Sequence, residues 1–150
     1  MPEANRPKWK FHCFLDHRGK DVLADWHRTL STKGRANFAR ARDQLKDQPK
    51  TSWDRPHASP LGNHIYVIRF KDENRTQHRA FGHFADEHHA FVITLYGEEK
   101  DGCYSPSNYS ERASLNKDVC DRDFAGRTKP CFSPGGTNVT PRGTNDSSAG

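Results

Sequence analysis

The chain has 150 residues, of which 32% are hydrophobic and 11% aromatic, and its formal net charge is +5. This length fits one domain with a modest core, and the clustered aromatic residues exclude complete disorder. The first residues form no apolar signal segment, and no stretch approaches the roughly 20 apolar residues of a membrane span. We therefore expect a soluble, cytoplasmic protein, and its positive charge favours an anionic partner.

The first third of the chain predicts a strand and two helices. Residues 9–15 alternate enough for a short strand, and residues 20–30 and 35–46 repeat apolar side chains at helical spacing. Ser31 or Thr32 can cap the second helix, and the short connection predicts an antiparallel helical hairpin. The polar side of the second helix is either a footprint for nucleic acid or an ordinary solvated surface. Its cations are Arg35, Arg40, Arg42 and Lys46.

Three consecutive strands are predicted at residues 65–71, 78–84 and 90–96, after a proline-punctuated connector. These runs are short, rich in β-branched and aromatic residues, and separated by turn-forming residues. Because side chains alternate along a strand, they divide into two faces. The apolar face, which should be covered by helices, contains Tyr66, Ile68, Phe70, Ala80, Gly82, Phe84, Phe91, Ile93 and Leu95. The second face contains Val67, Arg69, Lys71, Arg79, Phe81, His83, Val92, Thr94 and Tyr96.

The second face combines cations with aromatic rings. It is either a solvated sheet surface, which antiparallel sheets often have, or a surface for a phosphate-rich ligand that carries bases.

The remainder of the chain predicts one more helix, at about residues 107–119. Residues 1–8 are expected to be flexible, residues 9–124 to form one domain, and residues 125–150 to be a disordered polar tail. The predicted fold is α+β, with a small antiparallel sheet in the order strand-helix-helix-strand-strand-strand-helix. The helical hairpin is expected on one face of this sheet, together with the other helical segment.

Cysteine and histidine spacing gives no sign of a metal site. The four cysteines, Cys13, Cys103, Cys120 and Cys131, form no CxxC pair and are expected to be free thiols in a reducing compartment. The nine histidines include no pair at metal-ligand spacing on a helix. We therefore expect neither a metal nor another cofactor.

The sequence shows no nucleophile elbow, Gly-rich phosphate loop or paired carboxylates, although a Cys–His or Ser–His–Asp site stays open. Metal-free RNA cleavage needs only a base, cations that stabilise charge on phosphorus, and a proton donor for the leaving oxygen. Arg, Lys, His and Tyr side chains can fill these roles. His83 is a candidate general base, as are Lys71 and Lys100, since alternation places His83 on the second face and imidazole titrates near neutrality.

Short motifs follow one another in a defined order between residues 53 and 113. They are Trp53, Arg55-Pro56, Leu61, Ile68-Arg69-Phe70-Lys71, Arg79-Ala80-Phe81, and then Lys100, Tyr104, Pro106 and Ala113. Their order and spacing resemble the RelE/HigB toxins, in particular the phage-derived HigB-like branch. The resemblance extends over about residues 9–120, so that residues 9–124 would form a RelE-like toxin domain.

The resemblance implies the toxin of a type II toxin–antitoxin system. Such a toxin is a metal-independent, ribosome-associated mRNA endonuclease of the mRNA interferase type, and a small antitoxin neutralises it, here expected to be a helix-turn-helix protein. By position, Arg69 and Lys71 would contact phosphate and Arg79 would stabilise the transition state. Lys100 and Tyr104 would complete the groove, with Tyr104 stacking on a base or donating a proton.

One departure from the family pattern keeps other functions open. Glu98 and Glu99 precede the single Lys100, where the family usually has a more basic turn, and their charge would repel RNA if they line the groove. The alternative is a protein of the same fold that is not a ribonuclease. It could be a gyrase-inhibiting relative or an inactive module that binds nucleic acid or protein. A structural or unrelated small domain is the third possibility.

Overall fold

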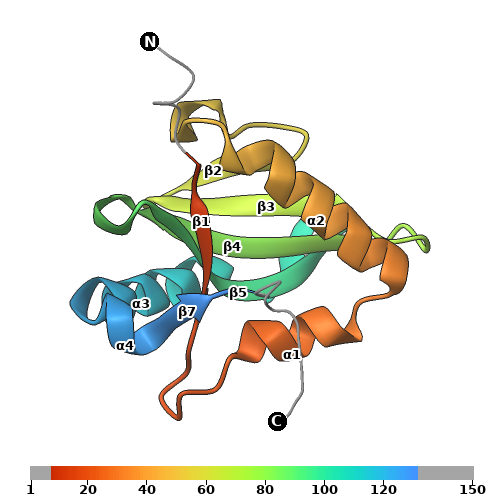
Figure 1. Ribbon diagram of the computed structural model, residues 1–150. Helices are drawn as coiled ribbons and strands as arrows, with labels where there is room; N and C mark the ends of the chain where they lie inside the picture. Colours follow the sequence, from red (N-terminus) through yellow and green to blue (C-terminus); the bar gives the residue numbers. More distant parts are fainter. Residues whose placement is uncertain (1–7, 132–150) are drawn as a thin grey trace, which may run out of the picture.

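The computed structural model describes residues 8–131 and has an α+β fold, as predicted (Figure 1). Of the predicted flexible residues 1–8, residues 1–7 lie outside the described residues, as do residues 132–150, most of the predicted tail. The elements are β1 (Lys10–Phe14), α1 (Val22–Thr29), α2 (Thr32–Lys46), η2 (Lys50–Ser52), β2 (Ala58–Gly62), β3 (Ile65–Lys71), β4 (Gln77–Ala85), η3 (Asp86–His88), β5 (Ala90–Lys100), β6 (Cys103–Ser105), α3 (Tyr109–Arg122), α4 (Phe124–Arg127) and β7 (Thr128–Pro130). No helix within residues 8–131 combines the length and the apolar character needed to cross a membrane.

The sheet has seven strands and is mixed, so the predicted small antiparallel sheet is wrong. Its order is β2-β3-β4-β5-β1-β7, with β6 paired to β5. β1 runs parallel to β5, whereas the other neighbouring pairs are antiparallel. Parallel neighbours need a long crossover, and here the whole chain from α1 to β4 separates the two strands. Three strands were not predicted, namely β2, β6 and β7.

The first face of the sheet is covered by α1 and α2. Asp21 caps α1 through Ala24 N, and Ser31 caps α2 through Gly34 N, as predicted for Ser31 or Thr32. α1 lies against β5 and α2 against β3, and the two helices diverge from their short connection in Figure 1. Their buried side chains join one core cluster with the sheet: Leu23, Trp26, Leu30, Phe38, Ala41 and Leu45 pack with Ile68, Phe70, Ala80, Phe91 and Ile93.

The opposite face is covered in part by α3, so the expectation that the helices share one face is wrong. Ala113 of α3 packs with Val67, Phe81 and Leu95, and Tyr109 stacks on Phe81 with ring centroids 5.1 Å apart. The centre of this face is apolar, and burying it removes hydrocarbon from water. The end of the face that carries Arg69 and Arg79 lies outside this cluster, and at the other end Val92 packs with Cys120 of α3 in a separate one.

A β-bulge at Thr94 changes which side chains of β5 share a face. Phe81 and Gly82 are neighbours on β4, but they pair with Leu95 and Ile93. Thr94 is therefore an extra residue on β5, and the alternation of side chains shifts by one position beyond it.

The bulge overturns two face predictions. Leu95 was expected under α1 and α2 but packs with Ala113 on the α3 side. Tyr96 was expected among the cations but stacks on Trp26 of α1, with ring centroids 5.1 Å apart. For the same reason Glu99, rather than Glu98, lies on the face of Arg79.

The chain continues in an ordered form past the predicted domain end at residue 124. α4 and β7 follow, and β7 pairs with β1. Cys131 forms a disulfide with Cys13. The prediction of a disordered tail is therefore wrong for residues 125–131, and the prediction of free thiols is wrong for these two cysteines. Cys103 is an exposed free thiol and Cys120 a buried one.

Candidate nucleic-acid interface

Cationic side chains from four parts of the chain surround a pocket of about 570 Å³ at the edge of the sheet, beyond the last β2 pairing with β3. We call it the cationic pocket. It is lined by Asn37, Arg40, Arg55, Pro56, His57, Arg69, Phe70, Lys71, Gln77 and Arg79, and none of these described residues is acidic. A lining with this charge attracts anions.

Arg69 and Arg79 share one face of the sheet, as the alternation of side chains predicted, and the register places them opposite one another on adjacent strands. Arg69 donates from Nη1 to Ser59 Oγ at 2.6 Å and from Nη2 to Tyr104 Oη at 3.3 Å. Its Nε is buried and has no acceptor within residues 8–131. Since an unpaired buried donor is unfavourable, a bound oxygen atom at this position would satisfy it.

Arg79 is only 4% exposed, and each of its guanidinium nitrogens has a protein acceptor. Nε and Nη2 both contact Glu99 Oε1, at 2.9 and 2.8 Å. Nη1 donates to the His78 carbonyl and Nη2 to Gln77 Oε1. The guanidinium is thus held in a defined orientation, and Glu99 offsets its charge.

Tyr104 joins the site from β6, the short strand after the β5 turn. Its hydroxyl accepts the hydrogen bond from Arg69, and its ring packs edge-on against Phe81, with centroids 5.5 Å apart. Tyr109 of α3 also packs edge-on against the Tyr104 ring, with centroids 4.9 Å apart. The phenol is therefore rigidly placed beside Arg69, and its half-buried ring leaves limited surface for stacking.

The pocket also contains residues that the sequence interpretation did not assign to the site. Arg55 and His57 come from the connector before β2, and the His57 carbonyl accepts from Arg69 N at 2.8 Å, which ties the connector to β3. Arg55 belonged to a recognised motif, which was the only signal for it. Nothing in the local sequence pointed to His57.

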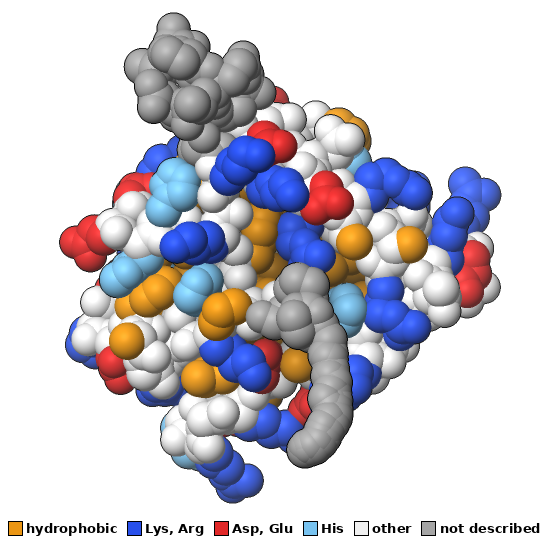
Figure 2. Space-filling model, in the orientation of Figure 1, with side chains coloured by type: hydrophobic (Ala, Val, Ile, Leu, Met, Phe, Trp, Pro, Cys, Tyr) orange, Lys and Arg blue, Asp and Glu red, His pale blue; other side chains and the backbone are white. Residues whose placement is uncertain are grey.

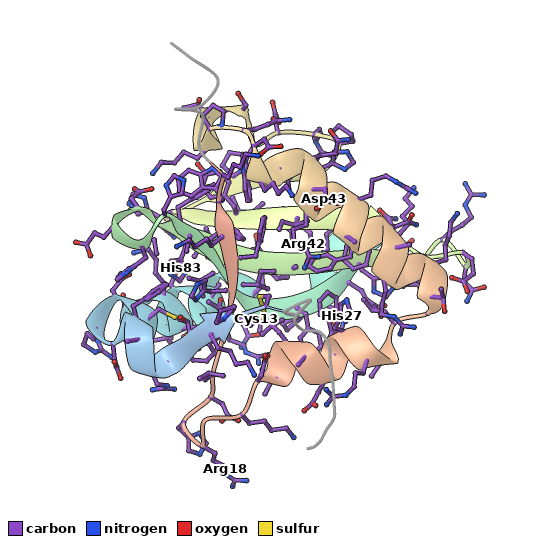
Figure 3. The ribbon with its side chains drawn as sticks, in the orientation of Figure 1. Cys13, Arg18, His27, Arg42, Asp43 and His83 are labelled. Carbon is purple, nitrogen blue, oxygen red and sulfur yellow. A yellow bond between two sulfur atoms is a disulfide. The ribbon has the colours of Figure 1, made fainter. Side chains whose placement is uncertain are left out.

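Of the three α2 arginines predicted to bind RNA, only Arg40 lines the cationic pocket. Arg35 donates to the Leu30 carbonyl at 2.6 Å and so closes the end of α1. Arg42 lies with His27 between α1 and α2 (Figure 3). Figure 2 shows Lys and Arg mixed with Asp and Glu on this side of the molecule, which is typical of an ordinary solvated surface rather than a continuous basic patch.

Two predicted catalytic residues, His83 and Lys100, are not brought to the pocket. His83 shares the face of Arg79 but lies four residues along β4, about 13 Å away for an extended strand. It is fully buried beside α3 (Figure 3). Lys100 follows Glu99 on β5 and therefore points to the opposite face. Neither residue lines the cationic pocket.

Lys71, by contrast, is exposed at the end of β3 and lines the pocket.

No protein family, no curated protein and no solved structure matches this chain. Within residues 8–131, no group of three or more His, Cys, Asp or Glu side chains could hold a metal ion.

His83 is expected to make the fold sensitive to acid. Burial lowers the pKa of His83 from 6.5 to about 4; nearby Lys117 also lowers it, and Asp121 opposes both effects. Its two ring nitrogens have no partner within the described residues. The imidazole of His83 therefore stays neutral in the folded chain until the pH approaches 4, whereas in the unfolded chain it takes up a proton near pH 6.5. The free energy of unfolding is therefore unaffected by the titration of His83 above pH 6.5. It falls as the pH drops from 6.5 towards 4, by up to about 3 kcal/mol.

Urea unfolding measured at several pH values between 4 and 7 tests this. His83→Leu should lose less stability than the wild type as the pH falls. Part of the loss should remain, because the pKa of His27 is also lowered to about 4. His17→Gln, at an exposed position, should leave the profile unchanged. A profile that is the same for His83→Leu and the wild type would contradict the burial of a neutral imidazole.

Proposed function

We propose that the chain binds single-stranded RNA in the cationic pocket and cleaves it without a metal, as the toxin of a type II toxin–antitoxin pair. The observation that carries this proposal is the register of Arg69 and Arg79, which face one another across adjacent strands in a pocket without acidic lining. Two guanidinium groups so placed can contact the oxygens of one phosphate or of adjacent phosphates. The RelE/HigB resemblance supplies the reaction, the ribosome as the place of action, and a helix-turn-helix antitoxin as the partner.

The pocket side chains, together with Tyr104, which contacts Arg69 from outside the pocket lining, offer a division of labour for cleavage at a 2′-hydroxyl. Arg69 and Arg79 would stabilise the extra negative charge on phosphorus. Lys71 or His57 would take the proton from the attacking hydroxyl, and Tyr104 would protonate the leaving oxygen. His57 takes the place that His83 held in the sequence interpretation, because His83 is buried elsewhere.

The alternative is binding without cleavage, and one observation favours it. Glu99 already neutralises Arg79 in the structure, so the residue expected to stabilise the transition state is engaged. A module that uses the remaining cations for nucleic acid or a protein partner, or a gyrase-inhibiting relative, would have the same pocket. The experiments below separate these outcomes.

Binding is tested by fluorescence anisotropy with a short single-stranded RNA that carries 2′-O-methyl groups and so resists cleavage. Arg69→Ala and Lys71→Ala should each weaken binding by about tenfold and reduce the slope of log K against log salt by about 0.7, as expected for one lost phosphate contact. Lys33→Ala, at an exposed position on α2 outside the pocket, should behave like the wild type. Thermal melts of each variant report whether it folds.

Cleavage is tested by inducing the chain in a bacterial host and mapping mRNA ends on ribosomes. We expect growth arrest with cuts in phase with codons, both absent in Arg69→Ala. Supercoiling defects with intact mRNA would support the gyrase-inhibiting alternative. RNA binding in vitro without cleavage in cells would support the binding module. RNA affinity that is the same in Arg69→Ala, Lys71→Ala and Lys33→Ala would refute the proposal.

A further inference from the structure

We propose that Glu99 controls the affinity of the cationic pocket, because its carboxylate competes with the ligand's phosphate for Arg79. This inference rests on the proposed function and adds to it a residue that the resemblance does not assign. Arg79 can use its charge for RNA only when the contact to Glu99 is released or shared.

The geometry of the pair makes Glu99 a direct competitor. A single oxygen, Oε1, accepts from both Nε and Nη2 of Arg79, at 2.9 and 2.8 Å. These two nitrogens form the side of the guanidinium that binds carboxylates and phosphates in a bidentate manner. The remaining nitrogen, Nη1, is held by the His78 carbonyl. No guanidinium nitrogen of Arg79 is therefore left without an acceptor.

The environment makes this contact stronger than a surface ion pair. The side chain of Arg79 is 5% exposed and that of Glu99 24% exposed, so solvent screens the pair weakly. Gly97 lies opposite Arg79 on β5. A Cβ atom at Gly97 would lie 1.9 Å from the Ser105 carbonyl oxygen. A glycine is therefore required where β6 approaches β5 beside the ion pair.

The charge of the pocket explains the consequence for the ligand. With Arg79 neutralised, the exposed cations Arg40, Arg55 and Lys71 remain for the first encounter. A ligand must then replace a carboxylate that is already in place, and phosphates held by the other cations raise the effective concentration of the one that does so. The pocket should consequently favour a chain of phosphates over a single one.

The test is Glu99→Gln, which keeps the size and one acceptor oxygen but removes the charge. The matched control is Glu98→Gln, the same change at the adjacent residue. Glu98 is exposed, lies on the opposite face of the sheet, and is the register partner of His78 on β4. In anisotropy with the 2′-O-methyl RNA, Glu99→Gln should bind about tenfold tighter, as expected when one charge-assisted contact becomes available. Its salt slope should be steeper by about 0.7. Glu98→Gln should stay close to the wild type.

Several results would overturn the inference. Equal gains in both variants would mean that only the net charge matters, and weaker binding by Glu99→Gln would mean that Glu99 positions Arg79 for the ligand. RNA binding that depends on Arg69 and Lys71 but not on Glu99 would keep the proposed function and remove this inference. Binding that none of these residues affects would remove the proposed function itself.

A second measurement covers the case in which Glu99→Gln does not fold. The Nε–H signal of Arg79 in the wild-type protein can be followed by NMR during titration with the same RNA. We expect it to shift as its acceptor changes from carboxylate to phosphate. An Arg79 signal that stays unchanged while signals of Lys71 shift would show that the ion pair persists in the complex and would overturn the inference.

Discussion

Trp53→Ala is expected to lower the free energy of unfolding by about 3–5 kcal/mol, the usual cost of removing a large aromatic side chain from a packed core. Trp53 is 1% exposed, and its indole contacts Phe84 and Phe91 with ring centroids 4.6 and 4.7 Å apart. Its Nε1 donates to the carbonyls of Leu45 and Gln48, each at 3.1 Å. Because typical domains are stable by about 5–15 kcal/mol, this single change should bring the chain close to unfolding.

Urea unfolding followed by circular dichroism measures this loss. Trp53→Phe is the matched variant, since it keeps an aromatic ring but removes the indole donor, while the Leu45 and Gln48 carbonyls keep Gln48 N and Trp9 Nε1 as donors. Trp53→Phe should lower the free energy of unfolding clearly less than Trp53→Ala does. Since Trp53 precedes Arg55 and His57 in the same connector, a partly folded Trp53→Ala should also lose RNA binding. A loss of stability below about 1 kcal/mol would contradict the packing described here.

Cys131→Ser is expected to lower the stability by about 2–5 kcal/mol. The bond between Cys13 and Cys131 closes a loop with a sequence separation of 118 residues, so it restricts the unfolded chain strongly. It also fixes β7 against β1 at the edge of the sheet. Adding a reducing agent to the wild type should reproduce the loss, because reduction removes the same cross-link.

Cys103→Ser is the control, since Cys103 is an exposed free thiol. It should leave stability unchanged, and a reducing agent should still destabilise it. If Cys131→Ser and the wild type unfold at the same urea concentration under oxidising conditions, the disulfide does not contribute to the stability of the folded chain. In a reducing compartment the two cysteines would be thiols, so the measured difference also tells how stable the chain would be there.

The local patterns of the sequence predicted the elements that depend on neighbouring residues. Residues 65–71 alternate β-branched and aromatic side chains and form β3 with the predicted bounds. The two helices follow from apolar spacing and from the cap at Ser31. β2 was missed because it is a short edge strand that contains Pro60, a residue common at sheet edges but unfavourable in predicted strands.

Features that depend on distant contacts could not be predicted in this way. The parallel pairing of β1 with β5 and the bond between Cys13 and Cys131 join segments far apart in the chain, and no spacing rule encodes either. In the site, alternation correctly placed Arg69 and Arg79 on one face, whereas their direct opposition depends on the strand register. The burial of His83 depends on where α3 packs, and a face assignment alone does not contain this information.

The extra residue at Thr94 has a consequence for any comparison of this chain with others. Odd-numbered residues of β5 point towards α1 and α2 before it, as Phe91 does, and even-numbered ones do so after it, as Tyr96 does. An alignment that preserves hydrophobic character but places a gap on the wrong side of residue 94 would invert the polarity of the strand's last six positions. Relatives of this chain should be aligned by phasing the two segments of the strand separately.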